Sequence, residues 1–244
     1  MSDGRPVHKA KRPEGATNRP NAEPGLTMRV RFSREGAPSY LAHLDMMRMF
    51  ERSLRRTSIS LAFTQGFNPH PVMNFALPLG VGVDTEADFA DFALTAAIDP
   101  DAFRERMNVA LPEGIRILDA RVAPEGGDSL MASVHAAMYR LRGPGLVAAA
   151  SRLPVEGPLP VGKKGKEGVK IVDVRPLLLG VESEGDGTLR LLAKAGSREN
   201  LRPDLFLQAL ADHAGLSQDE ADDAEIRRLV LFTAAPDGSL IPLS

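Results

Sequence analysis

The 244-residue chain contains no cysteine and no tryptophan, and it has only two tyrosines. The absence of cysteine excludes disulfides, thiolate catalysis, and zinc or iron–sulfur centres held by cysteine in this chain. It also fits a reducing compartment, so we expect a cytoplasmic protein. Stacking of RNA bases would have to use the ten phenylalanines, most of which fall at core positions.

Long apolar runs and a strong net charge are missing as well. No stretch approaches the ~20 apolar residues of a membrane-spanning helix, and no apolar segment of a signal peptide follows the start, so no membrane partner is predicted. The formal net charge is −2, which provides no overall attraction to nucleic acid. Any RNA binding must therefore come from local patches.

The chain divides into a tail and two similar halves. Residues 1–26 are rich in proline, glycine and basic residues, which predicts a disordered tail. The hydrophobic periods that follow predict strand, helix, strand, strand, helix, strand, and then the same order again. We therefore predict an α+β protein of two tandem ferredoxin-like (βαββαβ) halves, residues 27–125 and 126–244.

The first helix is expected to follow a strand that begins at Met28. Ser39 is placed to cap this helix, which should end near Arg56. Spacings of three and four predict one apolar face, formed by Tyr40, Leu44, Met47, Phe50 and Leu54. A short strand over residues 58–63 is expected next.

On the open side of the sheet, Asp91 could neutralise Arg29 or Arg31.

The segment "TQGFNPHPVMNFALPLGVG", residues 64–82, is longer than a hairpin needs. Its Asn-Pro-His-Pro core is rigid, because each proline fixes its own φ and restricts the residue before it. A rigid loop loses little entropy on binding. We expect it to present three polar side chains at the surface: Gln65, Asn68 and His70. Phe67 and Phe75 should anchor it in the core.

Basic residues gather in two places. Residues 28–72 contain seven arginines and three acidic residues, which gives a local net charge of +4. Arg52, Arg55 and Arg56 share the end of the first helix and form either a solvated terminus with ion pairs or a phosphate-binding patch. Asp45 is placed to pair with Arg48 or Arg52. Residues 162–170 predict a flexible hairpin tip without Walker-loop spacing. Its candidate phosphate contacts are Lys163, Lys164 and Lys166.

His43 and His70 are the candidate catalytic residues. His43 could equally be a partly buried structural histidine on the first helix. If the loop brings His70 to it, the pair could act as general acid and base on RNA, or bind a divalent metal together with a carboxylate. Asp45 points about 200° away from His43 on a regular helix, so these two cannot face one ligand.

Two long stretches carry a family resemblance: "YLAHLDMMRMFERSLRRTSISLAF" and "TQGFNPHPVMNFALPLGVGVDTEADFADF". They closely resemble the radical-SAM-linked domain family of unknown function, whose pattern is similar to "SHLD…RxFxRALRR" followed by "SQGFNPHPxxxFALPLPVGxES". The matching residues are His43, Leu44, Asp45, Arg48, Phe50, Arg52, 54–56, 65–71 and 75–82. The chain departs from the pattern at Gly80 and Asp84, where proline and glutamate are commoner.

The resemblance implies association with a radical SAM protein. The radical SAM cluster needs three cysteine thiolates, so another polypeptide would supply that chemistry. The leading hypothesis is a non-catalytic RNA-binding or adaptor module without a cofactor, with tRNA or rRNA as possible partners. The alternatives are a metal-independent endoribonuclease that uses His43 and His70, and a metal-binding hydrolase.

Overall fold

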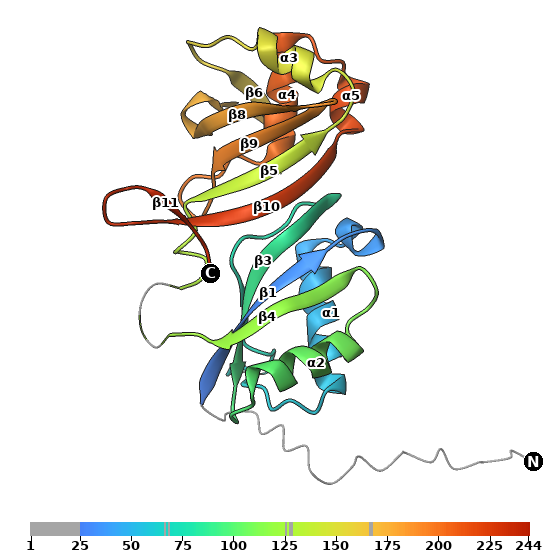
Figure 1. Cartoon of the computed structure of the whole chain (residues 1–244), viewed down its shortest axis with the longest axis vertical. Helices are drawn as coiled ribbons and strands as arrows, with labels where there is room; N and C mark the ends of the chain where they lie inside the picture. Colours follow the sequence, from blue (N-terminus) through green and yellow to red (C-terminus); the bar gives the residue numbers. More distant parts are fainter. Residues whose placement is uncertain (1–24, 66, 68, 125, 127–128, 166–167) are drawn as a thin grey trace, which may run out of the picture.

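The structure is a computed structural model that describes residues 25–244, apart from 66, 68, 125, 127–128 and 166–167. The tail expected at residues 1–26 lies outside the described residues up to position 24, and the first strand already begins at Leu26. Nine strands form one twisted sheet along the length of the molecule (Figure 1). The predicted α+β class is confirmed.

The first half of the chain builds one end of this sheet. Its elements are β1 (Leu26–Arg34), the 3-10 turn η1 (Ala37–Tyr40), α1 (His43–Arg56), β2 (Met73–Phe75), β3 (Val83–Leu94), α2 (Pro100–Ala110) and β4 (Ile115–Val122). The strand order is β4-β1-β3-β2, and all neighbours are antiparallel. Asp99 caps α2 by accepting a hydrogen bond from the Ala102 amide.

The second half repeats this order and adds a hairpin. Its elements are β5 (Ala136–Arg142), α3 (Leu146–Arg152), β6 (Pro160–Gly165), β7 (Gly168–Asp173), the 3-10 turn η2 (Arg175–Leu177), β8 (Leu178–Gly185), β9 (Thr188–Lys194), α4 (Pro203–Ala214), α5 (Gln218–Asp222), β10 (Glu225–Ala234) and β11 (Leu240–Pro242). The strand order is β10-β5-β9-β8, while β6 and β7 pair only with each other.

The two halves meet where β10 runs parallel to β3. Three residue pairs define the contact, from Ile226 beside Val83 to Arg228 beside Thr85. The later part of β3 pairs with β2 instead. Strand β3 therefore pairs with strands of the first half and, through β10, joins them to the strands of the second half.

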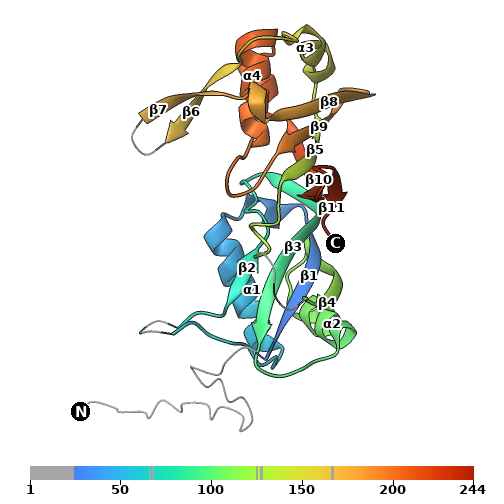
Figure 2. The ribbon, with the colours of Figure 1, turned by 90° about the vertical axis from the view of Figure 1, so that its left-hand side faces the viewer.

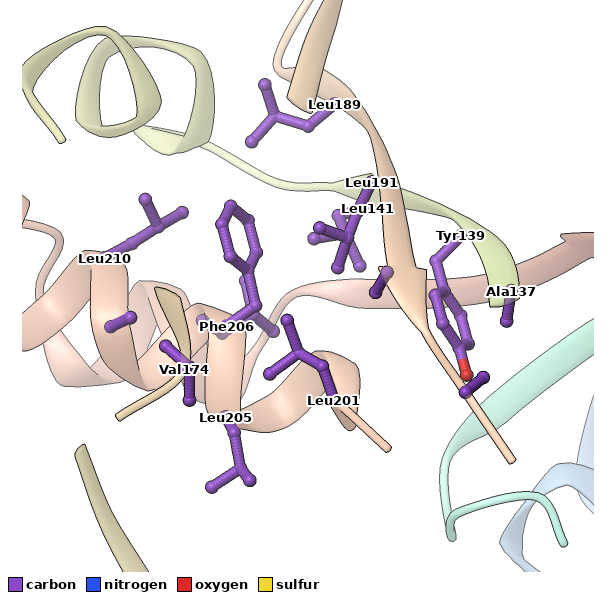
Figure 3. Close-up of a cluster of buried hydrophobic side chains, with 14 of the residues drawn as sticks. Ala137, Tyr139, Leu141, Val174, Leu189, Leu191, Leu201, Leu205, Phe206 and Leu210 are labelled. Atoms are coloured by element: carbon purple, nitrogen blue, oxygen red, sulfur yellow. The ribbon is translucent and has the colours of Figure 1, made fainter. Parts of the chain in front are cut away.

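Each half has its own hydrophobic core on the helix-covered side of the sheet. In the first half, Phe32, Phe50 and Phe75 contact one another with ring centroids 5.3–6.0 Å apart. In the second half, Phe206 of α4 faces strand residues that include Leu141 (Figure 3). Burying each such side chain contributes about 1.5–3 kcal/mol to folding.

Helix α1 differs from its expected position. Ala42, and not Ser39, is its N-cap, and the buried Ser39 hydroxyl instead donates to Asp84. The buried residues of α1 are Met46, Met49, Phe50, Ser53 and Leu54. Tyr40 and Leu44 were expected in the apolar face but are exposed. Tyr40 lies in the 3-10 turn before α1, and Leu44 lies on the side of α1 opposite the buried Met46.

The strand expected over residues 58–63 is also largely absent from the described part of the chain. Only two isolated bridges form there, Leu61 with Leu94 and Phe63 with Pro71. Strand β3, by contrast, is continuous from Val83 to Leu94. None of the helices in the described ranges is long and apolar enough to cross a membrane.

Candidate functional site

A buried ion pair joins the two halves. Arg228 of β10 donates to the carboxylate of Asp88 on β3 and, at 2.8 Å, to the carbonyl oxygen of Leu77. Arg228 and Asp88 are 1% and 2% exposed. Burial raises the pKa of the Asp88 carboxyl above its ordinary value, and Arg228 and Arg34 offset part of that rise. Tyr139 of β5 adjoins Arg228, and burial raises the pKa of its hydroxyl.

Arg34 and His43 extend this cluster into the first half. Arg34 is fully buried at the end of β1 and donates to the carbonyl oxygens of Gly80 (2.8 Å) and Val83 (2.6 Å). Burial lowers the pKa of Arg34 to about 10, so the guanidinium stays charged at neutral pH. Arg34 is one of the seven arginines counted between residues 28 and 72, but its hydrogen bonds hold the loop before β3.

His43 lies half-buried at the start of α1. Its ring packs edge-on against Phe75, with centroids 5.6 Å apart. Burial lowers the pKa of His43, and the nearby Asp88 carboxylate opposes that shift. The ring of His43 thus packs against a core residue of the first half.

The buried polar residues where the two halves meet are here called the junction cluster. Besides His43, it contains four residues that the sequence did not identify as candidate site residues: Arg34, Asp88, Tyr139 and Arg228. A signal for Arg34 was present, because it has the same strand parity as the buried Met28, Val30 and Phe32. Asp88 had no such signal, because both sides of β3 are buried there, as Phe89 and Ala90 show. A charged residue on the apolar phase of a strand must find a buried partner.

The segment 59–72 between α1 and β2, here named the 59–72 arm, projects from the side of the sheet that α1 covers (Figure 2). The Thr64 amide donates to the His70 carbonyl at 2.8 Å, and the Thr64 hydroxyl accepts from the His70 amide at 3.0 Å. Phe75 is buried, as expected. Phe67 was expected to be a buried anchor and is instead fully exposed, because the arm carries it beyond the core.

The predicted polar residues of the arm have different outcomes. Gln65 and His70 are exposed, whereas Asn68 lies outside the described residues. The structure does not join His70 to His43. Among the described residues, His70 bonds to Thr64 and His43 packs against Phe75, and no hydrogen bond or ring contact joins the two histidines.

The arginines at the end of α1 are only partly available. Arg56 donates to the carbonyl of Ala110, and Arg55 pairs with Glu51. Arg52 is exposed and has no hydrogen-bond or ion-pair partner in the part of the chain that the structure describes. Asp45 pairs with Arg48 at 3.1 Å, one of the two pairings considered.

The β6–β7 hairpin is the second projection, and it extends on the same side of the sheet as the 59–72 arm (Figure 2). The predicted hairpin at residues 162–170 is thus confirmed. Lys163 and Lys170 are exposed, and so are the apolar Val169 and Ile171. Lys166 lies outside the described residues, and only the backbone of Lys164 is described.

On the open face of the sheet, Arg29 and Asp91 pair as expected. The guanidinium donates through two nitrogens, at 2.8 and 2.9 Å, to the two carboxylate oxygens. This pair raises the pKa of Arg29. Arg31 on the same face is exposed.

Metal ligation gains no geometric support. Within the described ranges, no three histidine, aspartate or glutamate side chains are grouped so as to hold a metal ion. The arrangement instead offers exposed apolar side chains on two projections and cationic side chains on the hairpin, which suits the binding of a large partner.

Comparison with known proteins yields one family. The model of a family described as "Uncharacterized protein conserved in bacteria (DUF2344)" matches residues 27–203. This range covers the first half, the 59–72 arm and the β6–β7 hairpin, and it ends at the start of α4. A search of curated proteins found no match.

Proposed function

The chain belongs to this bacterial family, and on that premise we propose that it is a non-catalytic adaptor for a partner protein. The partner would dock on the side of the sheet from which the 59–72 arm and the β6–β7 hairpin project. The motif resemblance suggests the class of partner, a radical SAM protein, and the absence of cysteine leaves any cluster to that partner. The proposal includes a cytoplasmic location.

The observation that carries this proposal is the exposure of large apolar side chains on both projections. Phe67 is fully exposed on the arm, and Val169 and Ile171 are exposed on the hairpin. Protein interfaces are centred on such apolar and aromatic anchors, surrounded by polar groups. Lys163 and Lys170 would form a cationic border, so the partner surface should combine an apolar pocket with acidic residues.

The test is direct binding to a radical SAM protein of the same genome, reconstituted with its cluster, by isothermal titration calorimetry. Phe67→Ser should weaken binding about 30-fold or more, the loss typical of an interface anchor. Val109→Ser is the matched control, because Val109 is also strongly exposed but lies on α2. Equal affinity of the wild type and Phe67→Ser, or no complex, would refute the proposal.

RNA binding is the second candidate, carried by the unpaired Arg52 and the exposed Lys163 and Lys170. If these residues contact phosphates, affinity for mixed tRNA should fall steeply with salt. Arg52→Ala should then lower the salt dependence by about one released ion. The control is Arg106→Ala, at an exposed arginine of α2. Binding that does not respond to salt would count against this candidate.

Two finer hypotheses also remain proposals. The shared orders β4-β1-β3-β2 and β10-β5-β9-β8 support a tandem of ferredoxin-like halves. The enzymatic alternatives, an endoribonuclease or a metal-binding hydrolase at His43 and His70, would require RNA cleavage or bound metal that disappears in both His43→Gln and His70→Gln.

A further inference from the structure

A cavity of about 600 Å³ lies at the junction of the two halves. The first half contributes the loop before β3, with Leu77, Leu79 and Val81 in the wall. The second half contributes Tyr139 of β5 and Ile226 of β10. Pockets for small molecules commonly have this size and an apolar lining, and they often lie between domains.

A buried cationic group forms part of the cavity wall. Arg228 lines the cavity, is 1% exposed, and its Nε has no hydrogen-bond partner among the described residues. Arg34 lies behind the same loop and also has a buried Nε without a partner in the described ranges. The buried carboxylate of Asp88 lies beside both guanidinium groups, and the carboxylate of Asp84, which pairs with Arg227, also acts on Arg34.

The start of α4 adds a second source of positive potential. Arg202, its N-cap, makes no side-chain cap, and Arg202, Pro203, Ser197 and Asn200 all line the cavity. The amides of the first turn carry the positive end of the helix dipole. Arg202 and Asp204 neutralise each other, with Nε 2.9 Å from Oδ1, so they leave this potential unchanged.

Tyr139 links the apolar and the cationic parts of the cavity. It belongs to the core cluster of the second half, yet its hydroxyl points away from that core, towards the ribbon of the first half (Figure 3). A ligand in the cavity would therefore touch both halves at once.

From these features we infer that the junction cavity binds a small organic anion. Its apolar body would lie against Leu79, Val81 and Ile226. Its single anionic group, a carboxylate, phosphate or sulfonate, would lie near Asn200 at the start of α4. This site is separate from the two projections and does not depend on the adaptor function.

The probe for this test is 8-anilinonaphthalene-1-sulfonate, an aromatic body with one sulfonate, titrated into the full chain by fluorescence. We expect one saturable site. Leu79→Trp places a larger side chain in the cavity and should reduce affinity at least tenfold. The matched control, Val109→Trp on the outer face of α2, should bind the dye as the wild type does.

The charge requirement is tested separately. Asn200→Asp, at an exposed position on the cavity edge, should weaken the sulfonate dye several-fold. The same variant should leave binding of the uncharged N-phenyl-1-naphthylamine unchanged. Weak dye binding at many sites, unaffected by Leu79→Trp, would overturn the inference. If Asn200→Asp weakened the binding of both dyes equally, the inference that the ligand is an anion would be overturned.

Discussion

Arg228 on β10 donates to the carboxylate of Asp88 on β3, so a buried ion pair crosses the line where the two halves of the sheet meet. The backbone contact there is short, from Ile226 beside Val83 to Arg228 beside Thr85. The pair also ties the loop before β3 to the second half, because Arg228 bonds to the Leu77 carbonyl. Side chains and backbone therefore act together at this junction.

Removing one partner of this pair should be costly. Arg228→Met leaves Asp88 buried without its main counter-charge, which should lower the free energy of unfolding by about 3–5 kcal/mol. Urea denaturation of the full chain measures this. The double variant Arg228→Met/Asp88→Leu should recover much of the loss, since no buried charge is then left alone. A single variant that costs less than about 1 kcal/mol would contradict this account.

The Arg29–Asp91 pair should couple more strongly than the Arg48–Asp45 pair. The side chains of the first pair are 14% and 11% exposed, against 66% and 51% in the second. Double-mutant cycles to alanine should give roughly 1.5–3 kcal/mol for the first pair, as for hydrogen bonds to charged groups. The second should give less than about 0.5 kcal/mol. Equal couplings would show that burial does not control these pairs.

Gly114 and Gly36 provide a matched test of backbone crowding, because both have positive φ, +85° and +67°. A Cβ at Gly114 would lie 2.4 Å from the Glu35 carbonyl oxygen, whereas a Cβ at Gly36 would meet nothing within 4 Å. Gly36→Ala should cost only the backbone penalty of its φ +67°, ψ −140° conformation, about 1–3 kcal/mol. Gly114→Ala should cost clearly more in thermal unfolding. Similar costs would mean that this turn can move aside.

His43 predicts a pH dependence of stability. Burial lowers its pKa in the folded chain below the ordinary value near 6.5, so the unfolded chain binds the proton more readily. The contribution of His43 to stability should be complete above the unfolded pKa and be lost as the pH falls below about 6.5. His43→Gln should lose less stability than the wild type between pH 8 and pH 5.

The control for this effect is His70→Gln, which removes an exposed imidazole. This variant and His43→Gln therefore contain the same number of histidines. Unfolding in urea at both pH values gives the comparison. If His43→Gln and the wild type lose the same stability on acidification, the buried position of His43 does not produce the effect.

Much of the fold was accessible from local patterns. The Arg29–Asp91 pair is one of the two pairings expected on the open side of the sheet. The sequence also indicated α4 and the lysine-rich hairpin at residues 162–170. These features depend on residues close in sequence, whose periodicity reveals which side faces the core.

Errors occurred where distant residues compete with a local preference. Serine is a favoured N-cap residue, but the hydroxyl of Ser39 donates a hydrogen bond to Asp84 of β3. Helix α1 therefore begins at His43 instead. Phe67 is a large apolar residue of the kind that usually anchors a core, yet the arm that carries it extends beyond the sheet. Hydrophobicity alone cannot tell where a projecting hairpin ends.

By itself, the sequence determined the α+β class, most of the strand and helix order, and the absence of cysteine chemistry. Only the tertiary structure decided that Arg34, Asp88 and Arg228 meet at one junction, beside a cavity lined by both halves. The reason is that β10 pairs with β3 across 140 residues of chain. A buried charge signals that a partner is needed, but the fold selects which partner it is.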